Sequence, residues 1–186
     1  MRRVLLLALI WVASIPAIAL AQPRAVGQTV RWDLVQIQQG TALAGGADVG
    51  KDATTGDTFT LTGSGEAEPA EGNAAGGGTI VHHFASGKPD SAGVYVVTGF
   101  ISWQPGGGQL PIADGIGQLS EASAGVLEMA IRIFPASGGF RDGTLTVNCH
   151  LPGATIDVEE GIQLSIAGTP FNVEPNGGVT LFHVQK

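Results

Sequence analysis

Strict alternation of apolar and polar residues is clearest in the segment 125–151. The apolar residues of its two halves occupy every second position: Leu127, Met129, Ile131, Ile133, Leu145, Val147, Cys149 and Leu151. A period of two is typical of a half-buried β-strand. Gly138-Gly139 and Asp142-Gly143 between the two runs are turn-forming sequences. The segment therefore predicts a β-hairpin that directs these eight side chains into a core.

The polar face of this hairpin offers little chemistry. Glu128 and Arg132 share that face, so we expect a same-face ion pair. Cys149 falls on the apolar face, where a small buried hydrophobe is expected. His150 falls on the opposite face and is not placed to activate the thiol.

Similar alternation recurs along the chain, and no segment has a sustained helical period. Strands are predicted over residues 29–38, 57–63, 79–84, 93–103, 160–167, 171–173 and 179–185. Gly99 within the longest run predicts a bulge or bend. Many short strands separated by Gly and Pro predict an all-β fold, a single antiparallel β-sandwich or small β-barrel of about eight or more strands.

Three segments lack this alternation. Residues 22–56, apart from the strand at 29–38, are rich in Gly and Ala and are expected to form an irregular N-terminal part. Residues 64–78 are small and acidic and predict a mobile loop or a lid. The long connection 104–124 is expected to hold one helical turn near its end.

The N-terminus has the features of a secretory signal peptide. Arg2 and Arg3 precede an apolar run interrupted by Pro16, and Ala19-Leu20-Ala21 is a small-residue cleavage site. We therefore predict a signal peptide over 1–21 and a single β-domain over 22–186, in a secreted or periplasmic protein. No later apolar run reaches membrane-spanning length, so no membrane span is expected after cleavage.

Charge and motifs narrow the function classes. Without Arg2 and Arg3, seven basic residues remain against 16 acidic ones, a net charge of −9. Such a surface repels polyanions, so no nucleic-acid partner is expected. Cys149 is the single cysteine, so no internal disulfide can form. The chain lacks a nucleophile elbow and a P-loop; no catalytic residue is assigned and no cofactor is expected.

The histidines are the candidates for a metal site. There are four: His82, His83, His150 and His183. Adjacent strand residues point to opposite faces, so a site would combine His82 or His83 with His150 or His183 from other strands. The alternative is a set of hydrogen-bonded strand histidines, since no H-x-H or H-E-x-x-H spacing occurs.

Aromatic residues are the candidates for a ligand cavity. Trp32, Phe100 and Trp103, together with Tyr95 and Phe182, would line the interior of a small barrel. The alternative is that these side chains fill the core.

Two resemblances extend this interpretation. The segments 76–84, 98–103, 143–151, 159–162 and 177–183 are similar to a group of secreted microbial proteins of unknown function. That resemblance implies no activity. The alternation of Gly-rich turns and long strands also resembles calycin-type barrels such as allene oxide cyclase and dirigent proteins, which implies a barrel fold by analogy.

Three functions follow as expectations. The first is a secreted, non-catalytic β-domain with a binding or structural role. The second is a barrel that binds a small apolar ligand, with isomerase-like chemistry in its cavity. The third is a metal-assisted hydrolase that uses the histidines. The partner is accordingly expected to be a protein or a small apolar ligand.

Overall fold

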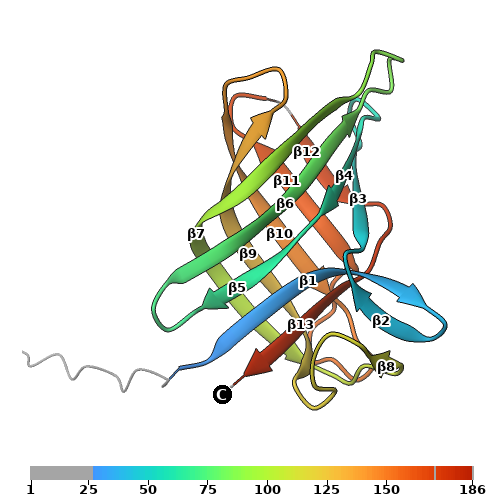
Figure 1. Ribbon diagram of the computed structural model, residues 1–186, viewed down its shortest axis with the longest axis vertical. Coiled ribbons are helices and arrows are strands. Elements are labelled where there is room, and N and C mark those ends of the chain that lie inside the picture. Colours follow the sequence, from blue (N-terminus) through green and yellow to red (C-terminus); the bar gives the residue numbers. More distant parts are fainter. Residues whose placement is uncertain (1–26, 170, 186) are drawn as a thin grey trace, which may run out of the picture.

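The computed structural model describes residues 27–169 and 171–185, and the predicted signal peptide 1–21 lies outside them. The described residues form an all-β fold, with thirteen strands in one largely antiparallel sheet (Figure 1). The strands are β1 (Thr29–Gln38), β2 (Thr41–Ala44), β3 (Ala47–Asp52), β4 (Thr58–Thr62), β5 (Ser64–Glu68), β6 (Asn73–His83), β7 (Ser91–Gly107), β8 (Ala113–Asp114), β9 (Ala122–Pro135), β10 (Arg141–Cys149), β11 (Gly161–Ile166), β12 (Asn172–Pro175) and β13 (Thr180–Gln185). Among the residues described, no helix has the length and apolar character to cross a membrane.

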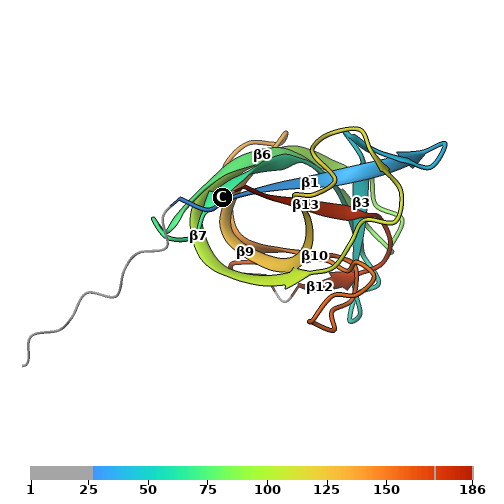
Figure 2. The same ribbon diagram turned by 90° about the horizontal axis from the view of Figure 1, so that it is seen from below.

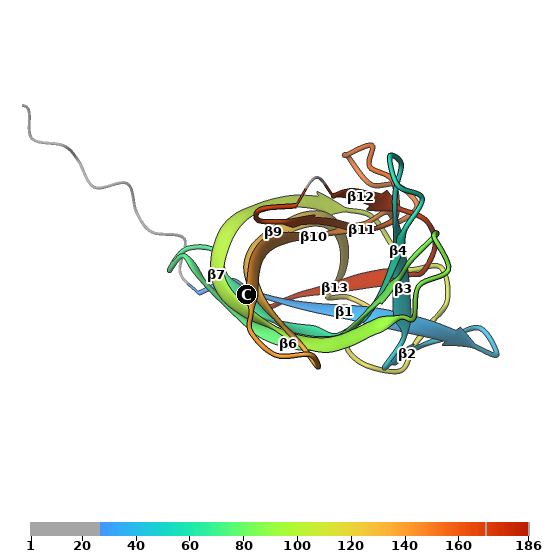
Figure 3. The same cartoon turned by 90° about the horizontal axis from the view of Figure 1, so that it is seen from above.

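The sheet closes on itself. β9 pairs with β7 on one side and with β10 on the other. From β10 the pairing runs through β11, β12, β3, β4 and β6 and returns to β7. Figures 2 and 3 show the resulting ring from its two ends. The all-β prediction is confirmed, and the closed pairing makes the architecture close to a barrel.

A second set of pairings completes one end of the ring. β13 joins the start of β9 to β1, and β1 continues through β5 to the first half of β6. The second half of β6 pairs with β4 instead. The long strands β6, β7 and β9 are therefore shared by both ends of the barrel.

The predicted hairpin 125–151 forms the centre of the structure as β9 and β10. Met129 lies opposite Leu145, and all eight apolar side chains of the alternating pattern are buried. Cys149 is fully buried, and its Sγ donates a hydrogen bond to the carbonyl of Thr180 at 3.3 Å. Burial raises the pKa of this thiol to about 12, an effect to which the charge of Glu160 adds.

The polar face of the hairpin differs from its prediction. Arg132 pairs with Asp142 across the hairpin at 2.7 Å rather than with Glu128. Glu128 instead accepts a hydrogen bond from Ser102 on β7. The predicted Glu128–Arg132 pair is wrong because each side chain has a cross-strand neighbour directly beside it.

The bulge predicted at Gly99 is present. The pairing of β7 with β9 shifts register between Val97 and Gly99, and again between Phe100 and Ser102 and between Pro105 and Gly107. Each shift bends the strand. Three shifts allow the 17 residues of β7 to follow the curved wall of the ring.

The loop or lid predicted over 64–78 is wrong, because these residues form β5 and the start of β6. Gly65 and Gly76 face each other in this pair and lie against the indole of Trp32. A Cβ at either position would approach that ring to 2.8 Å. The small residues therefore allow two strands to pack against a buried tryptophan, a reason that local sequence does not reveal.

Two further predictions of irregular structure are corrected. Residues 40–56 form β2 and β3, and β3 pairs with the distant β12 as well as with β4. The connection 104–124 contains the end of β7, β8 and turns in place of a helical turn. In both segments the strands depend on partners far along the chain.

Candidate functional site

A cavity of about 260 Å³ opens at the end of the barrel where the turns 84–90 and 136–140 lie, at the top of Figure 1. We call it the mouth cavity. Its apolar wall is formed by Phe59, Ile80, Ile133, Ile166 and Phe171. Its polar lining consists of His82, Ser91, Ser137, Arg141 and Thr169.

Strand register brings these residues together. Phe59 on β4 lies opposite His82 on β6, and His82 lies opposite Ser91 on β7. Ile133 and Ile166 come from the ends of β9 and β11. The cavity thus lies between the packed core and the rim of the barrel. Side chains that point inward from the ends of several strands line it.

His82 is held in place by a carboxylate. Its Nε2 lies 2.7 Å from Oδ2 of Asp57. Oδ1 of Asp57 accepts a hydrogen bond from the backbone N–H of Ala85 at 2.9 Å. Burial tends to raise the pKa of Asp57, but the Ala85 hydrogen bond and the pairing with His82 together hold it below its ordinary value.

Aromatic rings fix the plane of the same imidazole. It stacks on Phe59 with centroids 4.2 Å apart and lies 3.9 Å from the Phe84 ring. Phe171 meets it edge-on at 5.2 Å. The imidazole of His82 is consequently packed within a cluster of aromatic rings and has little freedom to rotate.

Asp52 anchors the segment that carries Phe171. Its Oδ2 accepts a hydrogen bond from the backbone N–H of Asn172, and its Oδ1 accepts three, from the backbone N–H groups of Thr54 and Thr55 and from the Thr55 hydroxyl. The Thr55 hydrogen bond and then that of Asn172 lower the pKa of Asp52. One buried carboxylate therefore joins the β3–β4 turn to the edge of the mouth cavity.

Arg141 supplies the guanidinium at this site. Its Nη1 donates to the carbonyl of Phe140 at 2.9 Å, and among the described residues it has no carboxylate partner. Arg132 on the adjacent strand is paired with Asp142 and stacks on Phe140. No aspartate or glutamate lines the mouth cavity within the described part of the chain.

The polar groups of the mouth cavity do not form a catalytic relay. A Ser–His–Asp relay needs one ring nitrogen on the carboxylate and the other on the hydroxyl. His82 meets the first requirement with Asp57. Within residues 27–169 and 171–185, Ser91 makes no hydrogen bond to the ring, although it is the cross-strand neighbour of His82.

The structure does not gather the four histidines. His83 points to the other face, where it contacts Asp90 at 2.8 Å and Thr60 at 3.2 Å. His150 is exposed beyond the end of β10. The described residues include no group of three or more His, Cys, Asp or Glu side chains placed to hold a metal ion.

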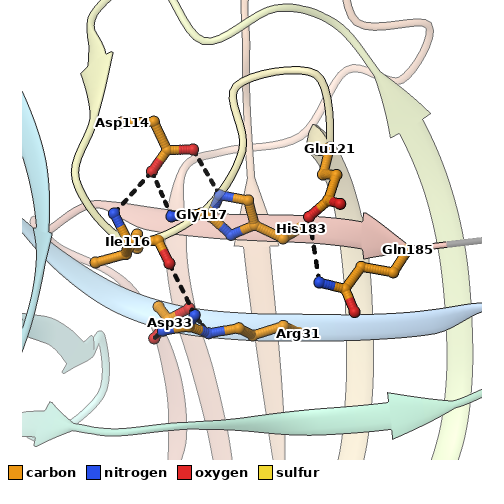
Figure 4. Close-up of polar contacts among 8 residues, drawn as sticks. All are labelled: Arg31, Asp33, Asp114, Ile116, Gly117, Glu121, His183 and Gln185. Atoms are coloured by element: carbon orange, nitrogen blue, oxygen red, sulfur yellow. Dashed lines mark hydrogen bonds and ion pairs between the residues drawn. The ribbon is translucent and has the colours of Figure 1, made fainter.

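His183 belongs to a separate cluster (Figure 4) beside β8, at the end of the barrel opposite the mouth cavity (Figure 1). Its Nε2 lies 2.7 Å from Oδ2 of Asp114, and both residues are buried. Oδ1 of Asp114 accepts hydrogen bonds from the backbone N–H groups of Ile116 and Gly117. Burial tends to raise the pKa of Asp114, but His183 and the two N–H groups lower it overall.

Arg31 completes this lower cluster. Its guanidinium makes a two-point contact with Asp33, at 2.8 and 3.0 Å, and donates to the carbonyl of Ile116 at 2.9 Å. The cluster ties the segment 113–117 to β1 and β13. Most of its polar atoms bond within the protein, whereas the buried Nδ1 of His183 has no hydrogen-bond partner among the described residues.

The three aromatic residues predicted to line a cavity do not line the mouth cavity. Trp32 is fully buried in the core. Phe100 and Trp103 are partly buried against the core, and Trp103 packs edge-to-face on Phe182 at 4.8 Å. The residues that do line it include Phe171 and Arg141, which the sequence analysis did not single out.

A second cavity of about 220 Å³ lies between the segment 110–112 and β13. Its walls are apolar except for His150, Glu160 and Thr180. Burial raises the pKa of Glu160, whose two oxygens accept hydrogen bonds from Thr180 and from the N–H of His150. Both oxygens of this carboxylate already accept hydrogen bonds. The second cavity therefore offers a ligand less polar bonding capacity than the mouth cavity does.

The chain matches no known protein family, no curated protein and no solved structure. Within the described residues, the mouth cavity is the candidate site that combines an apolar wall, an oriented imidazole and a guanidinium.

Proposed function

We propose that this protein is a barrel that binds a small, mainly apolar molecule in the mouth cavity. The observation that carries the proposal is the cavity itself, in which five apolar side chains face a few polar groups at the rim of a filled barrel. Ligand sites are typically concave and mostly apolar, with a small number of placed polar groups, and the mouths of barrels are common positions for them.

The size and rigidity of the cavity limit the ligand. A volume of about 260 Å³ lies just below the usual range of roughly 300–1,000 Å³ for small-molecule sites. The stacked rings of Phe59 and His82 and the anchored Phe171 segment form the wall before any ligand arrives. A preformed wall lowers the cost of ordering side chains on binding. The ligand is therefore a compact molecule with a flat or short apolar body.

A second candidate, a module that binds another protein, is supported by a different surface. Val94 and Phe134 are cross-strand neighbours on the outside of β7 and β9, and they are 50% and 40% exposed. Val96 and Phe140 extend this apolar area. Exposed apolar patches on a monomer often mark interaction sites. Under either candidate we propose an extracytoplasmic location, as residues 1–21 predict.

The test is a fragment screen by NMR on ¹⁵N-labelled protein comprising residues 22–186. We expect apolar fragments to shift the amide signals of Gly93, Ser137 and Thr169, which line or adjoin the mouth cavity. Ile166→Trp should fill the cavity and weaken this binding at least about tenfold, which corresponds to about 1.4 kcal/mol.

Val94→Trp is the matched control, because it adds the same indole to the exposed outer face. It should leave fragment binding unchanged. Shifts that cluster around Val94 and Phe134, or binding that survives Ile166→Trp with an intact spectrum, would contradict the proposal and favour the protein-binding candidate.

A further inference from the structure

We propose that the molecule bound in the mouth cavity carries a carboxylate, which Arg141 binds while the apolar body lies against Phe171 and Ile166. This inference rests on the proposed function and names the chemical class of its ligand. It follows from the distribution of charge around the cavity.

The mouth cavity has the opposite charge character to the protein as a whole. The full chain has 16 acidic and nine basic residues. Among the described residues, the cavity lining contains no acidic side chain and two that are basic, His82 and Arg141. A cationic ligand would meet no carboxylate here and would be repelled by Arg141, whereas an anion would be attracted.

Carboxylates near this end of the barrel are already engaged. Asp57 contacts His82 at 2.7 Å, Asp90 contacts His83 at 2.8 Å, and Asp142 contacts Arg132 at 2.7 Å. Lys88 adds a positive charge beside the Phe84 ring, 5.9 Å from its centroid. Arg141 is therefore the cation of the cavity lining that has no ion-pair partner among the described residues.

Arg141 and Arg132 differ in the N–H donors of the guanidinium that remain free for a ligand. Arg132 donates from Nε and Nη2 to both oxygens of Asp142. Arg141 donates from Nη1 to a backbone carbonyl, and no other hydrogen bond of its guanidinium is formed within the described residues. A guanidinium has five N–H donors in a planar fork that matches the two oxygens of a carboxylate. Arg141 can therefore offer a two-point contact at the cavity rim.

Hydroxyl groups complement this contact. Ser91 and Ser137 line the cavity and make no side-chain hydrogen bond within the described residues, whereas the Thr169 hydroxyl donates to the Ile166 carbonyl. Two hydroxyl donors and one guanidinium suit a singly charged carboxylate. A doubly charged phosphate monoester would require more than one unpaired cation at the lining for comparable neutralisation.

The experiment compares 3-phenylpropionate with 3-phenylpropanamide, which has the same body without the charge. Titrations followed by NMR of residues 22–186 at pH 7.5 and low salt should show the acid binding about tenfold more tightly than the amide. Arg141→Gln should weaken the acid about tenfold and change the amide less than about twofold. Higher salt should weaken only the acid, because the contact is near the surface.

Arg132→Gln is the matched control, since it removes a guanidinium that lies outside the cavity lining. It should leave both affinities unchanged. Equal binding of acid and amide, or an acid affinity that Arg141→Gln does not alter, would overturn the carboxylate assignment. So would cavity shifts caused by neutral fragments alone.

These outcomes separate the two proposals. If the amide or neutral fragments still bind and Ile166→Trp abolishes their shifts, the mouth cavity remains a ligand site and only the carboxylate is wrong. If no fragment, acid or amide shifts the cavity signals, both proposals fail. Because Arg141 is exposed, its substitution is not expected to disturb folding, and the spectrum of the unliganded variant verifies this.

Discussion

The pKa values of two buried aspartates are shifted in opposite directions by their surroundings, so the ionisation of each has the opposite effect on stability. Asp48 and Asp52 lie on the same strand, β3, and neither side chain is exposed. Burial raises the pKa of Asp48 to about 7, and the charge of Glu160 adds to this effect. Hydrogen bonds from Thr55 and Asn172 instead lower the pKa of Asp52. Four donor contacts on one carboxylate and one on the other explain the contrast.

The pH dependence of stability follows from these directions. Folded Asp48 keeps its proton up to about pH 7, whereas the unfolded chain releases it near pH 4. In that window the folded state binds more protons, so stability falls as pH rises. We expect Asp48→Asn to be more stable than the wild type at pH 8 by about 1–3 kcal/mol, and equally stable near pH 3.5, in urea denaturation.

Asp52→Asn should have the opposite effect. Its ionised form is stabilised in the folded protein, so its contribution is present above the unfolded pKa and is lost as pH falls below it. The variant should be less stable than the wild type at pH 8, with a smaller difference near pH 3. If both variants changed stability in the same direction at pH 8, the assigned environments would be wrong.

At the scale of elements, the β9–β10 hairpin contributes a continuous layer of buried apolar side chains. Leu127, Met129 and Ile131 alternate with half-exposed residues along β9, and Leu145 and Val147 continue the buried layer on β10. The two strands pair over nine successive residues, from Arg141 opposite Ile133 to Cys149 opposite Gly125. The face that the local alternation marks as apolar is the face that is buried in the tertiary structure. This agreement is why the hairpin was predictable.

Strand β9 carries a buried residue whose substitution tests the assigned strand face and an exposed residue that serves as the control. Ile131 on β9 is 1% exposed, and Phe134 on the same strand is 40% exposed. Ile131→Ala should lower the free energy of unfolding by about 2–5 kcal/mol, since it removes buried methyl groups and leaves a cavity. Phe134→Ala should cost less than about 1 kcal/mol. Chemical denaturation of both variants measures the difference, and equal losses would refute the assigned strand face.

The strands that sequence analysis missed are held by partners outside their own segment. β5 and the first half of β6 are formed largely of Gly and Ala and acidic residues. They acquire a fixed position because β5 also pairs with β1 and because Gly65 and Gly76 accommodate Trp32. Segments of this composition have low strand propensity in isolation, so the tertiary contacts override it.

For the whole molecule, closure of the ring gives the central strands partners on both sides. β9 pairs with β7, β10 and β13, so its length is covered along both edges. Closure removes the unpaired edges through which open sheets associate. The first strand begins at Thr29, so the predicted cleavage site before Gln22 precedes every described strand.

The predicted processing can be checked on the intact protein. If residues 1–21 are a signal peptide, expression of the full chain in a secreting bacterial host should give an exported product whose mass corresponds to Gln22–Lys186. Ala19→Leu and Ala21→Leu together should block cleavage, because the A-x-A site requires small residues. A product retained in the cytoplasm at full length from the unaltered chain would contradict the secreted location.

The sequence alone determined the class of fold and much of the core. Period-two alternation identified the β9–β10 hairpin and its eight inward side chains, because strand geometry links position to face directly, and Gly99 marked the bend in β7. The same rule predicted that His82 and His83 point to opposite faces, as the structure has them.

Only the tertiary structure decided how these elements close and where a ligand site forms. Asp57, Arg141 and Phe171 are far apart in the chain and stand at strand ends or in turns, where alternation does not show which residues share a site. They meet at the mouth because the ring aligns the ends of β4, β6, β7, β9, β10 and β11. Strand order and closure depend on pairings between remote segments, and a local pattern carries no information about which remote segment will be the partner.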